Sequence, residues 1–227
     1  MGTELPEVCF CNQLLFSELR SPLFFQMAAD SPCSAVIFLH GDSAPSFQEL
    51  HFLDIMNASM TLDYEHTFLT SDHHFKSGDL LSPWNICNEA LEEELIEKWN
   101  EVVRPSDTVL YLGDFSDGTC LETCDVFKKL NGNISLILGN HDFLGLDIYR
   151  CMFKEVHERL VVDNLAFSHC PVEVDKTLKL FHGHIHHESR DFPVFTRSRY
   201  DVAVMLHDGY PVKLSTALKQ MDSYAEI

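Results

Sequence analysis

The stretch TFLTSDHHF, residues 67–75, decides the fold because a short apolar run leads directly into an aspartate and two histidines. Four later apolar runs end in a similar way. They are Thr108–Leu112 before Gly113-Asp114, Ile134–Leu138 before Gly139-Asn140-His141-Asp142, Leu165–Phe167 before Ser168-His169, and Lys179–Phe181 shortly before Gly183-His184-Ile185-His186. Apolar runs of this length predict buried strands. Side chains that bind metals therefore follow five predicted strands, and strand ends are where an α/β fold builds its sites.

Helices are predicted between the first of these strands. Asn88 is expected to cap a helix over Glu89–Val103, with an apolar stripe that includes Ala90 and Trp99 and an outward face that includes Glu92. The segments Leu121–Leu130 and Phe143–Arg150 predict a second helix and a short third one. Strands and helices thus alternate in this part of the chain.

Beyond Arg159 the pattern is dominated by strands, which are predicted over Leu160–Ser168, Thr177–His182 and Tyr200–Leu206. A turn at Gly209-Tyr210-Pro211 is the last clear signal. Alternating strands and helices followed by a run of strands predict an α/β fold in which sheets and helices form layers.

The chain has 227 residues, 45% of them hydrophobic, which is enough for one catalytic domain with some sequence left over. Residues 1–66 carry no chemical signature. We assign them to an N-terminal extension of unknown role that could add strands to the fold, and we assign residues 67–227 to the catalytic domain.

Charge and targeting signals narrow the classes of partner and compartment. Acidic residues outnumber basic ones by 35 to 16, for a net charge of -19, which disfavours nucleic acid and anionic membranes as partners. The start lacks a signal-peptide pattern, and no apolar run approaches the roughly 20 residues of a membrane span. We therefore expect a soluble, cytoplasmic protein. The eight cysteines lack the doubled C-x-x-C spacing of a zinc module and are expected to be reduced thiols.

The residues after the strands have the chemistry of a metal site. On an extended segment, residues two apart project to the same side, so Asp72 can converge with His74, and His184 with His186. Asp114 has two oxygens with which to bridge two cations, and Asn140 and His169 add an amide oxygen and an imidazole. Each signal is weak alone, but five in this order indicate one site. The same alternation directs three neighbouring histidines to the opposite face: His73, His182 and His187.

These motifs resemble those of the calcineurin-like metallophosphoesterase superfamily, from about Thr67 to the C-terminus. The stretches around Asp72-His73-His74, Gly113-Asp114, Gly139-Asn140-His141-Asp142 and Ser168-His169-Cys170-Pro171 are similar to those of small single-domain phosphoesterases of bacteria and phages. The resemblance implies a four-layer α/β fold, in which two mixed β-sheets pack as a sandwich flanked by helices.

The resemblance also implies a dinuclear metal site. Asp72, His74 and His186 would hold the first ion, Asn140, His169 and His184 the second, and Asp114 would bridge them. The expected ions are two divalent metals, with manganese the working choice and iron, zinc or nickel the alternatives, because the donors are oxygen and nitrogen without thiolates. A metal-bridging hydroxide would attack a phosphate ester.

The expected reaction is hydrolysis of a phosphomonoester or phosphodiester with a small or nucleotide-like substrate. Two alternatives remain: a non-catalytic module that binds a partner protein on the same fold, and a nuclease of the same superfamily. The sequence leaves the oligomeric state open.

His141 is expected to handle the proton of the leaving group, a role that requires an orienting acceptor. Asp117 matches the second aspartate of a Gly-Asp-x-x-Asp motif, and Asp142 is its rival; the sequence does not choose between them. The related protein phosphatases have an arginine after that aspartate. Gly118 stands there in this chain, which argues against a phosphoprotein phosphatase.

Overall fold

The structure, a computed structural model, describes residues 61–77, 89–186 and 193–224. Most of the predicted N-terminal extension, the predicted cap Asn88 and His187 lie outside the described residues. Of residues 61–66, Leu62 and Tyr64 pack against one of the hydrophobic clusters of the domain. In the described part of the chain, no helix is long and apolar enough to cross a membrane.

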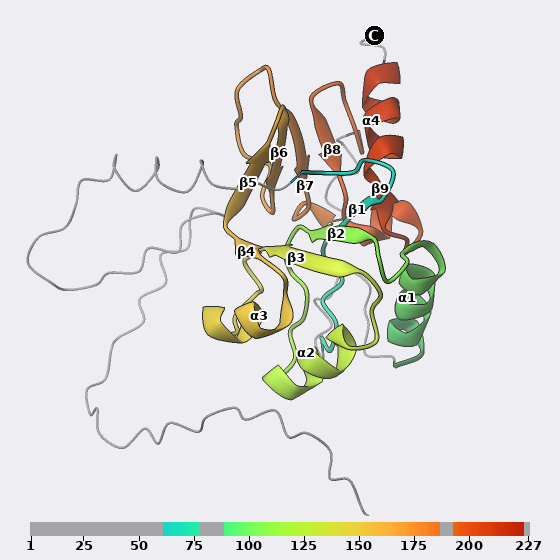
Figure 1. The fold of residues 1–227 in the computed structure, drawn as a ribbon, viewed down its shortest axis with the longest axis vertical. Helices are drawn as coiled ribbons and strands as arrows, with labels where there is room; N and C mark the ends of the chain where they lie inside the picture. The colour runs from blue at the N-terminus through green and yellow to red at the C-terminus, as the bar shows by residue number, and fades with distance from the viewer. Residues whose placement is uncertain (1–60, 78–88, 187–192, 225–227) are drawn as a thin grey trace, which may run out of the picture. The chain divides into compact units, whose positions relative to one another are not determined.

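The first sheet has the strand order β4-β3-β2-β1-β9 (Figure 1). Its strands are β1 (Thr67–Thr70), β2 (Thr108–Tyr111), β3 (Asn133–Ile137), β4 (Val156–His157) and β9 (Val212–Lys213). The first four run parallel, and β9 is antiparallel to β1. The carboxyl ends of β1, β2 and β3 therefore lie at the same edge of the sheet.

Three helices pack on one face of this sheet: α1 (Glu89–Val102), α2 (Cys120–Phe127) and α3 (Leu146–Met152). The alternation of side chains along each strand explains the packing. Phe68 and Val109 join Trp99 of α1 and Val126 of α2 in one hydrophobic cluster. Leu69 and Leu110, the next residues along the two strands, point to the other face and into a second cluster.

The second sheet packs against that other face. It has the order β5-β6-β7-β8, with β5 (Arg159–Val162), β6 (Leu165–Ser168), β7 (Lys179–His182) and β8 (Arg199–Asp201). β5 is antiparallel to β6, while β6, β7 and β8 are parallel. Phe167 and Phe181 meet the first sheet in the second cluster. The predicted fold of two mixed sheets packed together with flanking helices is confirmed.

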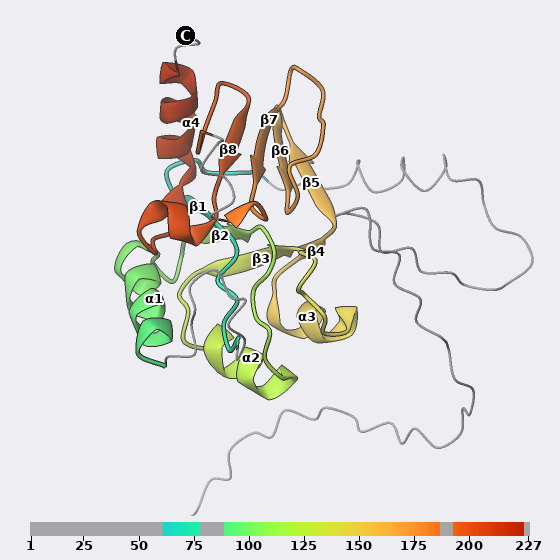
Figure 2. The ribbon, with the colours of Figure 1, turned by 180° about the vertical axis from the view of Figure 1, so that it is seen from behind.

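The helix α4 (Leu214–Ser223) lies beside β8 (Figure 2) and also contacts β9. Its buried residues Leu214, Ala217 and Met221 belong to the cluster between the sheets. Neither α4 nor β9 was predicted, because the sequence pattern gave no clear signal after Gly209-Tyr210-Pro211.

Several predicted elements are corrected by the structure. The predicted strand Leu160–Ser168 is a hairpin of β5 and β6, and Asp163 takes a left-handed φ of 54° in its turn. The predicted strand Tyr200–Leu206 ends at Asp201 and is followed by a 3-10 helix over Val204–His207. The predicted second helix is shorter than expected and the third begins later.

Two residues of α1 differ from the predicted pattern: Glu92 was predicted to face outward, and Ala90 was predicted to be buried. Glu92 is buried, 7% exposed, because Lys76 of the loop after β1 reaches it with Nζ 2.6 Å from Oε1. Ala90, assigned to the buried stripe, is exposed in the first turn. A tertiary contact, rather than the helical period, decides the position of Glu92.

Candidate metal centre

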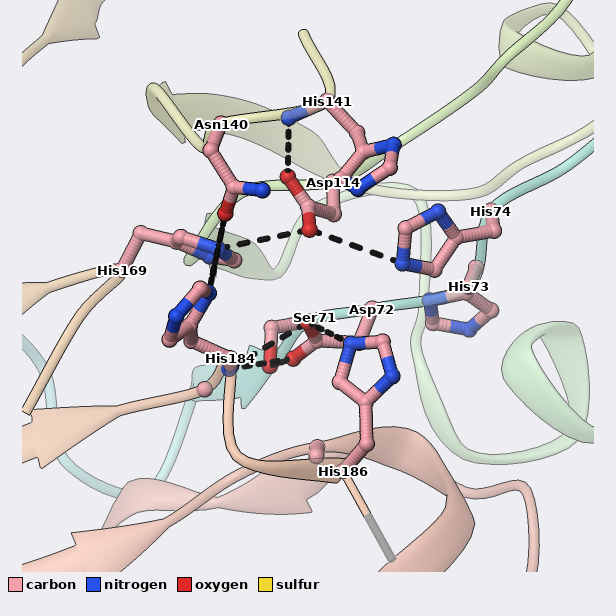
Figure 3. A network of polar contacts seen from close by, with 12 residues as sticks. Ser71, Asp72, His73, His74, Asp114, Asn140, His141, His169, His184 and His186 are labelled. Atoms are coloured by element: carbon pink, nitrogen blue, oxygen red, sulfur yellow. Dashed lines mark hydrogen bonds and ion pairs between the residues drawn. The ribbon is translucent and has the colours of Figure 1, made fainter. Parts of the chain in front are cut away.

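The structure brings all seven predicted metal-binding side chains together at the strand ends (Figure 3). Asp72 and His74 follow β1, Asp114 follows β2, and Asn140 follows β3. The second sheet contributes the rest: His169 after β6, and His184 and His186 after β7. Hydrogen bonds continue the pairing of β1 and β2 into the loops, since Asp72 N–H donates to Gly113 O at 3.0 Å and His74 N–H to Asp114 O at 3.1 Å.

A first cluster consists of Asp72, His74, Asp114 and His186, whose ligand atoms lie within 4.8 Å of one another. His186 Nε2 is 3.0 Å from Asp72 Oδ1, and His74 Nε2 is 3.5 Å from Asp114 Oδ2. The first three side chains are almost fully buried and His186 is partly exposed. Two carboxylates and two imidazoles form a donor set that suits a divalent transition metal.

A second cluster forms beside the first. Asn140 Oδ1 is 2.8 Å from His169 Nε2 and 2.9 Å from His184 Nδ1, and the two ring nitrogens are 3.1 Å apart. Asp114 Oδ2 is 3.3 Å from His169 Nε2. The same carboxylate oxygen therefore contacts one histidine of each cluster.

Two buried atoms of this arrangement lack a hydrogen-bond partner in the described chain: Asp114 Oδ2 and His74 Nε2. A buried polar atom without a partner is costly, and such groups in native proteins call for an explanation such as an ion. Both atoms point into the space between the two clusters (Figure 3). The residues present therefore fit bound divalent metal ions.

Neighbouring groups orient two of the imidazoles. His74 Nδ1 lies 3.1 Å from Asp117 Oδ2, and His169 Nδ1 lies 2.8 Å from the carbonyl oxygen of Leu112. Both partners accept hydrogen bonds, so each Nδ1 is the donor in its contact, and each Nε2 would be the atom that binds a metal ion. A carboxylate and a backbone carbonyl are the usual partners of metal-binding histidines.

The electrostatics of the site attract positive charge. Burial raises the pKa of Asp72, but the contacts with His186, the charge of His169 and the hydroxyl of Ser71 outweigh burial and lower the pKa to about 2. Burial lowers the pKa of His169, but the Asp114 carboxylate opposes it and the pKa is raised to about 9. Asp72 also accepts the backbone N–H of His184 at 3.1 Å.

The local backbone differs from the extended segments expected from the sequence. Five of the seven residues have positive φ: Asp72 (60°), His74 (47°), Asp114 (58°), His184 (75°) and His186 (50°). The side chains converge as predicted, but left-handed turns bring them together rather than strand alternation. Left-handed backbone costs a residue other than glycine about 1–3 kcal/mol, and such strain gathers at functional sites.

Three glycines allow the loops to approach each other. A Cβ at Gly113 would lie 2.6 Å from His169 Nδ1, and one at Gly139 would collide with the Asp114 carboxylate. A Cβ at Gly183 would collide with Asp72 and Ser71. The glycines that precede Asp114, Asn140 and His184 are therefore required by packing of the site.

The two rival aspartates occupy different places. Asp117 Oδ1 is 3.5 Å from His141 Nδ1, while its Oδ2 contacts His74. Asp142 instead accepts three backbone N–H groups, from Gly139 at 2.7 Å and from Asp114 and Phe115 at 3.0 Å each. The carboxylate beside His141 is Asp117, and Asp142 connects the loops after β2 and β3.

Two further residues border the site without having been assigned to it from the sequence. Ser71 donates a short hydrogen bond to Asp72, and Cys170 lies near His169 and His184. Each is the sequence neighbour of a predicted ligand, which is the signal that could have singled it out. His73 and His182 are buried and belong to neither cluster.

Comparisons with known proteins show the family of this chain. The family model described as calcineurin-like phosphoesterase matches residues 66–215. An uncharacterised protein of Methanocaldococcus jannaschii is 29% identical over 166 residues, which cover 68% of this chain and 90% of that protein.

Solved structures add a likeness of fold. A protein of unknown function from Aquifex aeolicus superimposes with a TM-score of 0.56 at 20% identity, over 68% of this chain and 98% of that chain. A nuclease from Pseudomonas putida gives a TM-score of 0.41 at 25% identity, over 58% of this chain and 64% of that one. Because the family model covers the strands and the whole candidate site, the chain belongs to the calcineurin-like phosphoesterase family.

Proposed function

We propose that this chain is a metal-dependent hydrolase of phosphate esters with a small or nucleotide-like substrate. One observation carries the proposal: the buried Asp114 Oδ2 accepts no hydrogen bond within the described chain and lies 3.5 Å from His74 Nε2 and 3.3 Å from His169 Nε2. A carboxylate oxygen between two donor sets is suited to a pair of divalent cations, which phosphatases and nucleases use. Membership of the phosphoesterase family supports the same class of reaction.

Asp72, His74 and His186 would hold one ion and Asn140, His169 and His184 the other, with Asp114 shared. Bound ions would supply Lewis acidity toward a phosphoryl oxygen and toward the attacking water. Oxygen and nitrogen donors suit manganese, iron, zinc and nickel, and we propose manganese for the first cluster.

His141 protonates the oxygen of the leaving group. Its side chain is 44% exposed and therefore accessible to a substrate, and Asp117 Oδ1 lies 3.5 Å from its Nδ1. The contact with Asp117 raises the pKa of His141 above its ordinary value, although partial burial opposes the rise. The contact therefore favours the protonated ring, whose Nε2–H can donate to the leaving group. General acids of this kind typically contribute about 10²- to 10⁴-fold to the rate.

Phe143 offers a surface for the organic part of the substrate. Its side chain is 76% exposed, and its ring centroid lies 5.5 Å from that of His141. Nucleobases stack on exposed aromatic rings, with a contribution of about 1–3 kcal/mol per base. The net charge of -19 disfavours a long polyanion. A mononucleotide ester is therefore the proposed substrate class.

Hydrolysis of p-nitrophenyl phosphate and bis(p-nitrophenyl) phosphate with added manganese tests the reaction. Asp114→Asn and His141→Ala should each lose activity by about 10²-fold or more. Asp163→Asn is the matched control, because Asp163 has a φ of 54° against 58° for Asp114 but lies in the β5–β6 turn. Equal activity of wild type and Asp114→Asn would refute the proposal.

The same panel separates the alternatives. Metal binding without turnover of any ester would favour a partner-binding module, and preferred cleavage of single-stranded DNA would favour a nuclease. His157→Ala, a change at a half-buried histidine of β4, controls for the loss of an imidazole outside the site.

The role of Phe143 is tested with two esters that share a leaving group, thymidine 5′-(p-nitrophenyl phosphate) and methyl p-nitrophenyl phosphate. Phe143→Ala should raise the KM of the nucleotide ester by about fivefold or more, the equivalent of the weakest stacking energy, and leave the methyl ester nearly unchanged. Leu121→Ala, at a residue of α2 that is 78% exposed, is the control. An equal effect on both esters would reject the nucleotide preference and leave the hydrolase proposal standing.

A further inference from the structure

A thiol lies next to the second cluster. One ligand atom from each of His169, Cys170 and His184 lies within 4.8 Å of the other two. His169 and His184 are the imidazoles that contact Asn140. The first cluster, Asp72, His74, Asp114 and His186, contains no sulfur. The two clusters therefore differ in the softness of the donors around them.

The backbone holds Cys170 beside these rings. β6 ends at Ser168, and the carbonyl oxygen of His169 accepts the N–H of Gly183 at 2.9 Å, which joins the loop carrying Cys170 to the loop carrying His184. The carbonyl of Cys170 itself accepts the N–H of Val172 at 2.9 Å. The proximity of the thiol to the cluster thus follows from the parallel pairing of β6 and β7.

A second observation favours a cation at this cluster. Asp114 Oδ2 is buried without a hydrogen-bond partner in the described chain and lies 3.3 Å from His169 Nε2. Burial of a carboxylate oxygen without a hydrogen bond is costly, and a bound cation would offset that cost. The other described cysteines, Cys120, Cys124 and Cys151, belong to none of the metal-binding groups found among the described residues.

We propose that Cys170 Sγ is a thiolate donor to the metal ion at the second cluster, and that this cluster takes a softer ion such as zinc while the first takes a harder one such as manganese. On binding, the thiol releases its proton to solvent as the sulfur–metal bond forms, with no change of oxidation state. Thiolates select zinc over manganese, whereas carboxylate-rich sites suit manganese. The proposal rests on the metal centre of the proposed function and extends it to the identity of the two ions.

Cobalt reports thiolate ligation directly, without any measurement of activity. The full chain, stripped of metal with a chelator, is titrated with Co²⁺ and followed by absorption. A thiolate ligand gives a charge-transfer band in the near ultraviolet, while visible bands report bound cobalt whatever its ligands. We expect both sets of bands in the wild type and in the control Cys151→Ser, and only the visible bands in Cys170→Ser.

Each other outcome has a distinct meaning. A near-ultraviolet band that persists in Cys170→Ser, or visible bands without it in the wild type, would refute thiolate ligation and leave the metal centre intact. Absence of all cobalt bands in the wild type would refute the metal centre, and this proposal with it. Competition with a zinc indicator should show that the zinc Kd of Cys170→Ser is raised by about tenfold or more, while its manganese Kd is unchanged.

A second measurement uses the unmodified chain and does not depend on the folding of a variant. Iodoacetamide labelling with and without zinc is quantified for each cysteine by peptide mass spectrometry. Zinc should protect Cys170, while the exposed Cys151 should be labelled equally in both samples. Equal labelling of Cys170 with and without bound zinc would overturn the proposal.

Discussion

The buried His73 should make this domain sensitive to acid. Its side chain is 0% exposed and stacks on Phe75, with ring centroids 4.8 Å apart, while Trp99 and Tyr111 surround it. Nδ1 lies 2.8 Å from the Tyr111 hydroxyl, and Nε2 has no hydrogen-bond partner in the described chain. Burial lowers the pKa of His73 from 6.5 to about 3, with the charge of Asp72 opposing and that of His74 reinforcing the shift.

The sign of the pH effect follows from the two pKa values. Between pH 6.5 and about pH 3 the unfolded chain binds a proton at His73 that the folded chain does not. The free energy of unfolding therefore falls with decreasing pH across this window, and the contribution is fully present above 6.5. The linkage relation gives a loss of about 2 kcal/mol between about pH 7.5 and about pH 5.

The variant His73→Phe removes the titrating group and keeps an aromatic ring in the same packing. It loses the hydrogen bond to Tyr111, which costs about 1 kcal/mol at every pH. Urea unfolding of both proteins in the presence of a chelator should therefore show that the free energy of unfolding of the wild type falls by about 2 kcal/mol more than that of the variant as the pH falls from about 7.5 to about 5. Parallel pH profiles for the two proteins would refute the reasoning.

Three further predictions concern the site. Asp142→Ala leaves three backbone N–H groups without their acceptor and should destabilise the fold by at least about 3 kcal/mol, whereas Asp117→Ala should lower kcat and change the melting temperature little. Thermal denaturation and kinetics of both variants test this prediction, and a stable Asp142→Ala beside an unstable Asp117→Ala would contradict it. Gly183→Ala should weaken metal binding measured by calorimetry, because its methyl group meets Asp72, while Gly145→Ala, where a Cβ meets nothing within 4 Å, should bind metal like the wild type. Removing the metal with a chelator should lower the free energy of unfolding by about 2.7 kcal/mol, compared with the protein in manganese at one hundred times its Kd. If the melting temperature of Asp114→Asn still rose with manganese, the assigned ligands would be wrong.

The arrangement of the site could be predicted from the sequence because the metal-binding side chains directly follow the predicted parallel strands. Asp72, Asp114 and Asn140 follow runs apolar enough to predict parallel strands, so their convergence at one sheet edge needed no knowledge of side-chain packing. The second sheet was harder to predict. The reversal at Asp163 falls between Val162 and Leu165, where a four-residue turn leaves the apolar pattern nearly uninterrupted.

Other features depend on contacts between distant segments. Glu92 is buried by Lys76, sixteen residues away in the chain, and no helical pattern contains that information. Whether Asp117 or Asp142 orients His141 depends on which carboxylate faces an imidazole and which faces backbone N–H groups. Both aspartates lie in loops, and the sequence does not show where a loop side chain points. The left-handed backbone of Asp72 and His184 is likewise fixed by the partner loops and glycines around them.

The positive φ angles of five metal-binding residues determine which substitutions the fold tolerates at these positions. Asparagine and glycine keep such a backbone at low cost, whereas β-branched residues do not. Glycine at Asp72 or His184 would remove a donor and relieve strain together. Such a variant should lose its response to metal but resist urea better than expected from the deleted contacts. At these positions, metal binding favours the present side chain, whereas the stability of the fold favours glycine.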